Sequence, residues 1–515
     1  MEEWLDTIAT KRDYVIATIL CAMKKGLAAI IPLMSVDRGS SKPLHRQIYE
    51  SYRSAIVSHQ LRPGQRVPSS RGLAAELRIS RIPVLNSHAQ LLAEGYFESR
   101  KGAGTFISRS LPEQMTVCPP RTARAASLSA APRRVSSTVN HLPPAMSKPW
   151  VCGRGAFSVS QLGFDHFPLQ VWSNLMTRHC RNLQVNALHY VNPMGSEALR
   201  EAIATYLRTA RAVRCEARQI MIVNGSQQAL EISARALLDP GDQVWIEDPG
   251  YRMARYVFMM ARCRLVPVPV DEEGLMVGSG IKRARNARAA FVTPSHQFPL
   301  GVTMSASRRL QLLHWAQRSG SWIIEDDYDS EYRYASRPVA SLQGLDTDCR
   351  VIYIGTFSKV LFPSMRLGYM VIPSDLVGRF AAVRHAIDLG APEAYQAALI
   401  DFIAEGHFAR HLRRMRLLYG SRRNALVESL RQELGSMLEV VGGEAGMHLA
   451  ALLPKGFRDE AIAEKAALQK LWLWPLSPSY LGESPRHGFI LGFGGISEKE
   501  MAPAVRKLRG VLKDR

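Results

Sequence analysis

The chain has 515 residues, more than one hydrophobic core usually supports, so two or more domains are expected. Hydrophobic residues make up 46% and charged residues 22%, as in a soluble globular protein rather than a fibrous or disordered one. The formal net charge of +21 indicates an anionic partner such as nucleic acid. Part of this charge is concentrated between Asp37 and Ser110, where twelve Lys or Arg stand against five Asp or Glu.

The cysteines show neither a disulfide framework nor metal-ligand spacing. There is no CxxC pair, which favours free thiols in a reducing cytoplasm and gives no reason to expect a metal site. The seven are Cys21, Cys118, Cys152, Cys180, Cys215, Cys263 and Cys349.

The first 35 residues are uninformative about the fold. Residues 14–36 are apolar enough to resemble a signal or membrane segment, but two lysines interrupt them and no cleavage motif follows. We therefore treat residues 1–35 as an N-terminal extension, with a mis-assigned start codon as an alternative and Met23 or Met34 as the true beginning.

Residues 36–109 show helical periodicity punctuated by turn signals, and we call this segment the head. Apolar residues recur on one face of a helix expected at 43–61. Ser69 or Ser70 can cap a second helix at 71–77, and a third is expected at 82–94. Two short helices joined by a tight turn form a helix–turn–helix unit, whose second helix enters the major groove of DNA.

A basic hairpin is expected after these helices. Strands are predicted at 95–98 and 105–107, around the sequence RKGAG at 100–104. The glycines allow close approach to a DNA backbone, and Arg100 and Lys101 can neutralise phosphate. The alternative is a solvated hairpin that contacts no DNA.

Two further zones follow the head. Residues 110–153 are rich in Pro, Ala, Ser and Arg, which predicts a flexible linker. From residue 154 onward, in a segment that we call the body, short apolar runs alternate with helical patterns. This alternation predicts an α/β fold, a largely parallel sheet with helices on both faces. The runs are 219–223, 243–246, 289–292, 321–324 and 351–354. The last hundred residues are expected to form a smaller α+β domain that closes on a strand at 489–493.

The strongest chemical signal is GTFSKVLFPSMRLGYM at residues 355–370. Lys359 follows an apolar strand and can form an imine with an aldehyde, while Ser358 and Arg366 can hold a phosphate. The alternative for Lys359 is a solvent-facing lysine.

An acidic cluster ends the strand that precedes this motif. A pyridoxal 5′-phosphate (PLP) cofactor needs a carboxylate at its pyridine nitrogen and a donor for its ring hydroxyl. Asp326 is the candidate for the first role and Tyr328 for the second, with Asp327 as a competing carboxylate. The alternative is an exposed acidic loop.

Two upstream segments fit the same cofactor. A small-residue turn at a helix N-terminus binds anions, so Gly225, Ser226 and Gln227 are candidates for phosphate binding. Tyr251, in IEDPGY, is placed to stack on a pyridine ring, and the alternative is an ordinary surface turn.

The head resembles the GntR family of winged-helix regulators. The resemblance covers residues 36–109 and rests on PSSRGLAAEL, Ser80–Arg81, QLLAEGYFESR and the GxGT at 102–105. It implies that the arginine after the cap serines and the arginine at the turn, here Arg71 and Arg81, contact double-stranded DNA. The candidate DNA-binding residues are Ser69, Ser70, Arg71, Ser80, Arg81, Asn86, Arg100, Lys101, Gly102, Gly104 and Thr105.

The recognition helix departs from the family pattern. It usually begins with Asn or Thr followed by Thr and carries a later Arg. Here stand Ile82, Pro83, Leu85, Asn86 and His88, so fewer polar groups are available to read base edges.

The body, residues 154–515, resembles the fold-type I aminotransferases. This resemblance implies that Lys359 is the Schiff-base lysine, Asp326 the partner of the pyridine nitrogen, Tyr328 the donor to the ring hydroxyl and Tyr251 the stacking aromatic. The implied phosphate ligands are Gly225, Ser226, Gln227, Ser358 and Arg366. Tyr190, in HYVNPMG, matches an aromatic that reaches the phosphate from the neighbouring subunit, which implies a homodimer.

Head and body together resemble the MocR/GabR subfamily of GntR regulators, through PSHQFPLG, IEDDYDSEYRY and SKVLFPSMRLGY. Known members are cytoplasmic homodimers that bind PLP and regulate vitamin B6 or amino-compound genes. The resemblance implies a PLP-dependent DNA-binding transcription regulator that senses PLP or an amino compound, with no membrane partner. The alternatives are an active aminotransferase with an appended head, and a structural protein with a vestigial cofactor site.

Two departures bear on catalysis. The usual Asn-Pro-x-Gly is FPLG at 298–301, so the asparagine that contacts the ring hydroxyl is missing, and His296 or Gln297 is its candidate replacement. The C-terminal strand GFILGFGG lacks the arginine that binds a substrate carboxylate. Arg486 and Arg252 are the candidates for an effector carboxylate. We therefore expect regulation as the primary role, with residual transaminase activity left open.

Overall fold

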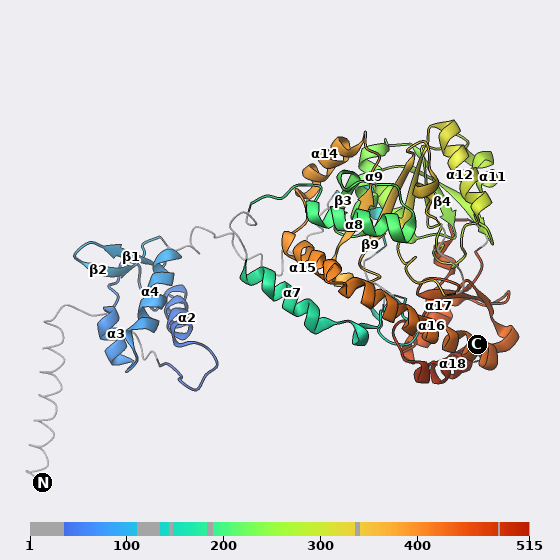
Figure 1. Cartoon of the computed structure of the whole chain (residues 1–515). Helices are drawn as coiled ribbons and strands as arrows, with labels where there is room; N and C mark the ends of the chain where they lie inside the picture. Colours follow the sequence, from blue (N-terminus) through green and yellow to red (C-terminus); the bar gives the residue numbers. More distant parts are fainter. Residues whose placement is uncertain are drawn as a thin grey trace, which may run out of the picture. The chain divides into compact units, whose positions relative to one another are not determined.

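The computed structural model describes residues 35–110, 134–143, 148–159, 161–182, 189–334, 340–482 and 485–513 (Figure 1). The chain divides into two compact units between Arg134 and Val135. Nearly all of the predicted N-terminal extension, and the middle of the predicted linker, lie outside the described residues.

The head contains the predicted helices and strands, with small differences at their ends. These are α2 (Leu44–Val57), α3 (Ser70–Glu76), α4 (Arg81–Ala93), β1 (Phe97–Arg100) and β2 (Gly104–Ile107). Ser69 caps α3, since its hydroxyl accepts a hydrogen bond from the Gly72 backbone N–H at 3.1 Å. The strands β1 and β2 pair antiparallel, so Arg100 lies in a strand and not in the loop expected for it.

Aromatic rings pack edge to face in the core of the head. The rings of Tyr52 and Phe97 meet edge to face at 5.2 Å, and His88 packs on both, at 5.7 Å from Tyr52 and 5.4 Å from Phe97. Burial lowers the pKa of His88 to about 4. His88 is therefore a neutral core residue near pH 7 and does not belong to the exposed surface of α4.

The body is built on an eight-stranded sheet in the order β3-β10-β9-β8-β7-β4-β5-β6 (Figure 1). The strands are β3 (Ile220–Val223), β4 (Gln243–Asp248), β5 (Arg264–Asp271), β6 (Gly274–Leu275), β7 (Ala289–Val292), β8 (Trp322–Asp327), β9 (Val351–Thr356) and β10 (Gly368–Val371). The five strands β5, β4, β7, β8 and β9 run parallel, while β10 and β6 pair antiparallel with their neighbours. The predicted mostly parallel sheet is confirmed.

Helices cover both faces of this sheet. Along β4, Val244 and Ile246 belong to one buried cluster and Trp245 to another, because successive side chains of a strand point to opposite faces. Trp245 stacks on Trp315 with ring centroids 3.8 Å apart. Helices of the first face are α9 (Ser226–Leu237), α10 (Arg252–Met260) and α14 (Val377–Asp388), and those of the second are α11 (Val277–Ala284), α12 (Ala306–Ser319) and α13 (Leu342–Leu345).

The C-terminal part is the predicted α+β subdomain. Its antiparallel sheet has the order β11-β12-β14-β13 and consists of β11 (Glu439–Val441), β12 (His448–Leu452), β13 (Trp474–Pro475) and β14 (Gly488–Gly492). The long helix α16 (His407–Leu434) packs beside α18 (Glu498–Lys513) (Figure 1). The remaining helices of the body are α7 (Leu169–Arg181), α8 (Glu197–Arg211), α15 (Glu393–Ala404) and α17 (Asp459–Leu468).

The body begins earlier than the predicted linker boundary at residue 153. The short helix α6 (Pro149–Cys152) places Trp150 in the main core of the body with 2% of its surface exposed. The Trp150 carbonyl accepts a hydrogen bond from the Trp474 indole at 2.8 Å. Composition indicated a linker because Pro, Ser and Ala surround this single large anchor, and one buried tryptophan does not change a composition average.

In the part of the chain that the structure describes, no helix is both long and apolar enough to cross a membrane.

Candidate cofactor site and DNA-binding head

The carboxyl ends of β8 and β9 bring the predicted acid and lysine to one edge of the sheet. The strands are parallel, with Asp326 opposite Ile354 and Asp327 opposite Gly355. Lys359 follows shortly after β9, and Asp326 lies near enough to act electrostatically on its amine. Ligands of open α/β sheets bind at this edge, so the two groups stand where a cofactor is expected.

Of the two neighbouring carboxylates, Asp326 is the one without an ion pair in the described structure. Both acids are buried, and the Oδ1 of each has no hydrogen-bond partner among the described residues. Burial, reinforced by Asp327 and Asp329, raises the pKa of Asp326 to about 8. Burial also acts to raise the pKa of Asp327, but its ion pair with Arg211 at 2.7 Å helps to hold that pKa below the usual value. The geometry favours Asp326 over Asp327 as the partner of a protonated ring nitrogen.

Lys359 is half-buried beside these acids. Burial lowers the pKa of its amine below the usual 10.5, while Asp329 and Asp326 act in the opposite direction. A lower pKa leaves more of the amine neutral near pH 7, which is the form that attacks an aldehyde. The solvent-facing alternative for Lys359 does not fit this placement.

Four of the predicted phosphate ligands, Gly225, Ser226, Gln227 and Arg366, lie at the N-terminus of α9. Gly225 has a φ of +93°, and a Cβ built on it would lie 3.3 Å from Arg366 Nη1. The Arg366 guanidinium therefore lies beside the N-cap residue of α9, and both a cation and a helix N-terminus attract anions. The Ser358 hydroxyl oxygen is buried and without a hydrogen-bond partner among the described residues. Gln227 is turned differently: its amide donates to the Tyr251 hydroxyl at 3.3 Å.

Tyr251 lies close to the acid and the helix terminus. Burial raises the pKa of its hydroxyl to about 12, and Asp326 adds to this effect. Its ring meets Phe298 edge to face at 5.4 Å. Phe298 occupies the position of the missing asparagine, so an apolar ring stands where an amide is usual.

His296 and Gln297, the two candidate replacements for the asparagine, have different surroundings. The Gln297 amide nitrogen lies within 3.2 Å of Glu247 Oε2 and donates to the carbonyls of Pro249 and Phe298 at 2.8 and 2.7 Å. Its amide therefore maintains the local chain path. His296 is buried with Nδ1 3.0 Å from the Tyr328 hydroxyl, and its Nε2 has no partner in the described chain. His296 is the better candidate.

Two residues of this neighbourhood escaped the sequence reasoning. Asp329 Oδ2 lies 3.0 Å from His296 Nδ1, which places the proton of the ring on Nδ1 because a carboxylate only accepts. His448, from β12, brings its ring to 4.6 Å from His296. Ligand atoms of these three buried residues lie within 4.8 Å of one another. The repeated acids of EDDYDSEY are a signal that could have indicated Asp329, whereas no local motif marks His448.

The remaining predicted residues of the body lie apart from this cluster or on the surface. Tyr190 is 89% exposed, and Arg252 is half-buried at the start of α10. Arg486 is exposed and paired with Glu439 Oε2 at 2.7 Å, so its charge is already matched. Neither arginine is brought to the Lys359 cluster by a contact in the described structure.

In the head, the predicted arginines lie on the surface around the start of α4. Arg71 and Arg81 are exposed, and Arg81 Nε donates to the Ser70 hydroxyl at 3.1 Å. Ser69 therefore caps α3 and Ser70 holds the Arg81 side chain, while the guanidinium groups of Arg71 and Arg81 remain at the surface. Asn86 is exposed on α4, and Ser80 precedes the helix without capping it through its side chain.

The hairpin presents fewer free charges than expected. Arg100 pairs with Glu98 at 2.5 Å and lies over the Phe106 ring at 4.5 Å. Lys101, Gly102 and Gly104 are exposed at the tip, and Thr105 is half-buried. Because Glu98 already neutralises Arg100, Lys101 is the stronger candidate for a phosphate contact in this hairpin.

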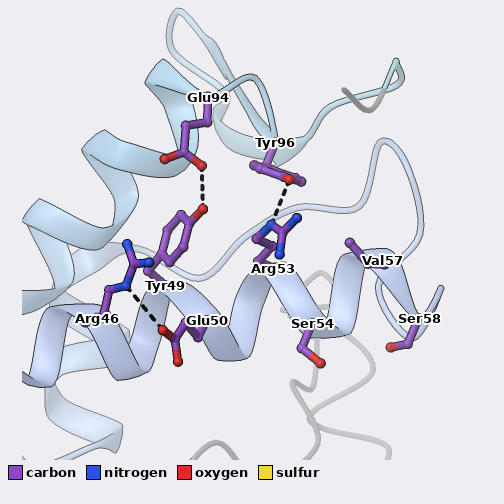
Figure 2. Close-up of a pocket in the computed structure, with 9 residues that line it drawn as sticks. All are labelled: Arg46, Tyr49, Glu50, Arg53, Ser54, Val57, Ser58, Glu94 and Tyr96. Carbon is purple, nitrogen blue, oxygen red and sulfur yellow. Dashed lines mark hydrogen bonds and ion pairs between the residues drawn. The ribbon is translucent and has the colours of Figure 1, made fainter. Parts of the chain in front are cut away.

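A hollow of about 710 Å³ lies between α2 and the carboxyl end of α4. Figure 2 shows its side chains paired with one another: Tyr49 donates to Glu94 at 2.5 Å and Arg53 to Tyr96 at 2.9 Å. Recognition helices contact bases through their amino-terminal residues. The hollow stands at the opposite end of α4 and is not the base-reading surface.

Comparisons with known proteins agree with this geometry. The family model "Bacterial regulatory proteins, gntR family" matches residues 44–107, and "Aminotransferase class I and II" matches residues 156–507. The chain is 39% identical over 488 residues to the "Probable rhizopine catabolism regulatory protein MocR" of Rhizobium meliloti, covering 93% of this chain and 96% of that protein. The chain belongs to the MocR/GabR subfamily of GntR-family transcription regulators.

Other members and the solved aminotransferases extend this assignment. The "HTH-type pyridoxine biosynthesis transcriptional regulator PdxR" of Corynebacterium glutamicum is 29% identical, over 88% of this MocR-type chain and 92% of the relative. The crystal structure of the Pyrococcus horikoshii kynurenine aminotransferase has a TM-score of 0.69 and 25% identity, covering 75% of this chain and 98% of the enzyme. The body of this MocR-type regulator therefore has the fold of a PLP-dependent family.

The residues of the body fit PLP. The buried, unpartnered oxygen of Asp326 suits the pyridine N–H, and that of Ser358 suits a phosphate. The Gly225 turn leaves room that a Cβ would fill, directly against the Arg366 guanidinium. Lys359 stands between these features in the chain and provides the amine. The body thus offers an acceptor for the ring nitrogen, polar and cationic groups for the phosphate, and an amine for the carbonyl group of the cofactor.

Proposed function

We propose that this MocR-type chain is a PLP-dependent, DNA-binding transcription regulator that works as a homodimer and responds to PLP or an amino compound. The observation that carries the proposal is the buried Asp326 oxygen left without a donor beside the half-buried Lys359 amine. A body that served only as a scaffold would not need to bury such a pair. The exposed arginines of the GntR head supply the other half of the proposal.

Each residue has a role toward the cofactor. Lys359 would hold it through Nζ, Asp326 would keep its ring nitrogen protonated, and Tyr251 would pack on its ring. Arg366, Ser358 and the start of α9 would bind the phosphate. When bound, PLP supplies a carbonyl group that captures amines and an electron-withdrawing ring. The Tyr328 hydroxyl lies 3.0 Å from His296 Nδ1 and donates to the His296 carbonyl at 2.9 Å, and it would contact the ring hydroxyl of the cofactor.

A signal can act on DNA binding only through its different affinity for two arrangements of the protein. The Tyr190 side chain is 89% exposed on its own chain. We infer that it contributes to the phosphate site of the partner subunit. In this arrangement dimerisation completes the phosphate site. Cofactor binding and subunit association then reinforce each other.

The competing function is that of an active aminotransferase, and the intact Lys359–Asp326 arrangement favours it. Efficient turnover of α-amino acids also needs a cation for the substrate carboxylate. Strand β14 supplies none, and Arg486 is paired with Glu439. A steady-state assay across amino donors with an oxo-acid acceptor distinguishes the two, because robust multiple turnover would favour the enzyme.

The first test is binding of the purified protein to the DNA upstream of its own gene, with and without saturating PLP. Specific binding that depends on PLP supports the proposal. Salt-sensitive binding that ignores both sequence and PLP contradicts the sensing role. The same samples, run in a sedimentation experiment, show whether PLP favours the dimer.

A further inference from the structure

The first two turns of α4 expose apolar side chains at the positions where a recognition helix reads bases. Ile82 is 67% exposed and Leu85 is 43% exposed. Residues three apart lie on the same helical face, so the two side chains form one apolar surface. Exposed branched aliphatic residues at the amino-terminal end of a recognition helix stand directly in the region that meets base edges.

The buried face of α4 keeps Ile82 and Leu85 at the surface. Val84, Ser87, His88 and Leu91 are buried in the core of the head. Turning Ile82 and Leu85 inward would expose Val84 and Leu91, so the two exposed side chains are not displaced core residues. The apolar surface is therefore a stable feature of the folded head.

The surroundings of this surface indicate the nature of its partner. Arg81 directly precedes it and donates to Ser70, the chain neighbour of Arg71. Both arginines are exposed, while no charged residue occurs from Ile82 to Ala93. Cationic residues at the edge of an uncharged strip match a DNA duplex, in which anionic phosphates flank a less charged groove floor. An apolar protein surface would leave the two guanidinium groups without partners.

Within the major groove, the apolar group that a base presents is the C5-methyl group of thymine. Asn86 is exposed next to Leu85, and an asparagine amide can pair with N6 and N7 of adenine. The structure assigns α4 the reading of A·T pairs, in which Ile82 and Leu85 contact thymine methyl groups and Asn86 contacts adenine. This inference rests on the proposed DNA binding and specifies its target.

The test isolates the methyl group. Full-length protein with PLP selects its binding sites from a random duplex pool, and the selected site is then made with thymine or with uracil, which lacks only the C5-methyl group. Uracil weakens wild-type binding about fourfold for each contacted methyl, equivalent to about 0.8 kcal/mol. Ile82→Ala and Leu85→Ala bind the thymine site more weakly and each loses part of the thymine–uracil difference.

Two control variants make the result specific. Val57→Ala removes a 46% exposed aliphatic side chain from α2 and should leave the thymine–uracil difference unchanged. Arg71→Ala should weaken binding to both duplexes equally and reduce the salt slope by about one. Circular dichroism of each variant verifies that the head stays folded.

The outcomes separate this inference from the proposed function. Tight binding with equal affinity for both duplexes, or selected sites without A·T pairs, overturns the inference but keeps DNA binding. No binding to any duplex at low salt refutes the proposed function itself. If Ile82→Ala and Leu85→Ala change only subunit association, the surface contacts protein and the inference is wrong.

Discussion

Arg211 and Asp327 are 116 positions apart in the sequence and form a buried ion pair of 2.7 Å inside the body. Tyr353 adds a hydrogen bond to the same Asp327 oxygen at 2.5 Å. The neighbouring Asp326 makes neither contact, since successive side chains of β8 point to opposite faces. Two adjacent carboxylates thus have different surroundings: Asp327 is tied into the body by Arg211, and Asp326 is the one that we propose for cofactor binding.

Exchanging each acid for its amide should separate these two roles. Asp327→Asn leaves Arg211 as an uncompensated buried charge, so we expect the free energy of unfolding to fall by about 3–5 kcal/mol. Asp326→Asn should leave that free energy equal or higher and weaken PLP binding more than tenfold, about 1.4 kcal/mol or more. Denaturant unfolding of the cofactor-free chain and a PLP titration measure the two quantities. The reverse pattern would exchange the two assignments.

The raised pKa of Asp326 predicts how the cofactor-free protein responds to pH. Its folded pKa is about 8 and its unfolded pKa is near 4, so the folded chain holds the extra proton between these values. The stability this group contributes is present below pH 4 and is lost as pH rises through 8. We expect the free energy of unfolding to fall with pH by up to about 1.4 kcal/mol per unit for this proton. In Asp326→Asn this slope should be smaller, and an unchanged slope would contradict the assignment.

Gly225→Ala should damage the phosphate site. The φ of +93° disfavours any side chain, and the new Cβ would press on Arg366 Nη1 at 3.3 Å. We expect PLP affinity to fall at least tenfold. Gly241→Ala is the matched control, since Gly241 has a similar φ of +96° but open space around its Cβ. Equal loss of PLP affinity in both variants would mean that backbone strain alone is responsible.

His296 and Gln297 should differ in their variants. His296→Ala removes the group beside Tyr328, so PLP affinity should fall and the pH dependence of the absorbance of the bound cofactor should shift. Gln297→Ala removes one donor to Glu247 and the amide donor to two backbone carbonyls, and should lower the free energy of unfolding by about 1–3 kcal/mol. Absorbance titration and denaturant unfolding verify the two. A cofactor-specific effect confined to Gln297→Ala would reverse our choice.

Trp150→Ala tests where the body begins. Removing this buried side chain should cost about 3–5 kcal/mol of stability. Leu169→Ala, at a 69% exposed position of α7, should change stability by less than about 0.5 kcal/mol. Thermal and denaturant unfolding of the full chain provide the comparison. Equal stability of both variants would mean that residues 149–152 belong to the linker and not to the body.

Much of the architecture was predictable, because it depends on local patterns. Alternating strands and helices imply a parallel sheet, and the carboxyl ends of parallel strands meet at one edge. The motifs containing Asp326 and Lys359 could therefore be placed together from sequence. Family resemblance supplied their roles toward PLP.

The rest depends on contacts between distant segments. Asp327 is paired with Arg211, and His448 reaches His296 from the C-terminal sheet, so no local pattern marks either contact. The pairing of Arg100 with Glu98 depends on side-chain conformation in the hairpin. The apolar surface of α4 could be seen in the sequence as a departure from the family, but only the structure shows that its side chains are exposed.

The buried acids at the edge of the sheet also affect how long the protein survives. Burial raises the pKa of Asp326 to about 8 and that of Glu247 to about 7, so the pocket without its cofactor carries an electrostatic cost. A ligand that binds only the folded chain stabilises it in proportion to its concentration. Vitamin supply would then set the rate at which proteases remove the chain, and a cell short of PLP would hold fewer copies of this regulator whatever their affinity for DNA.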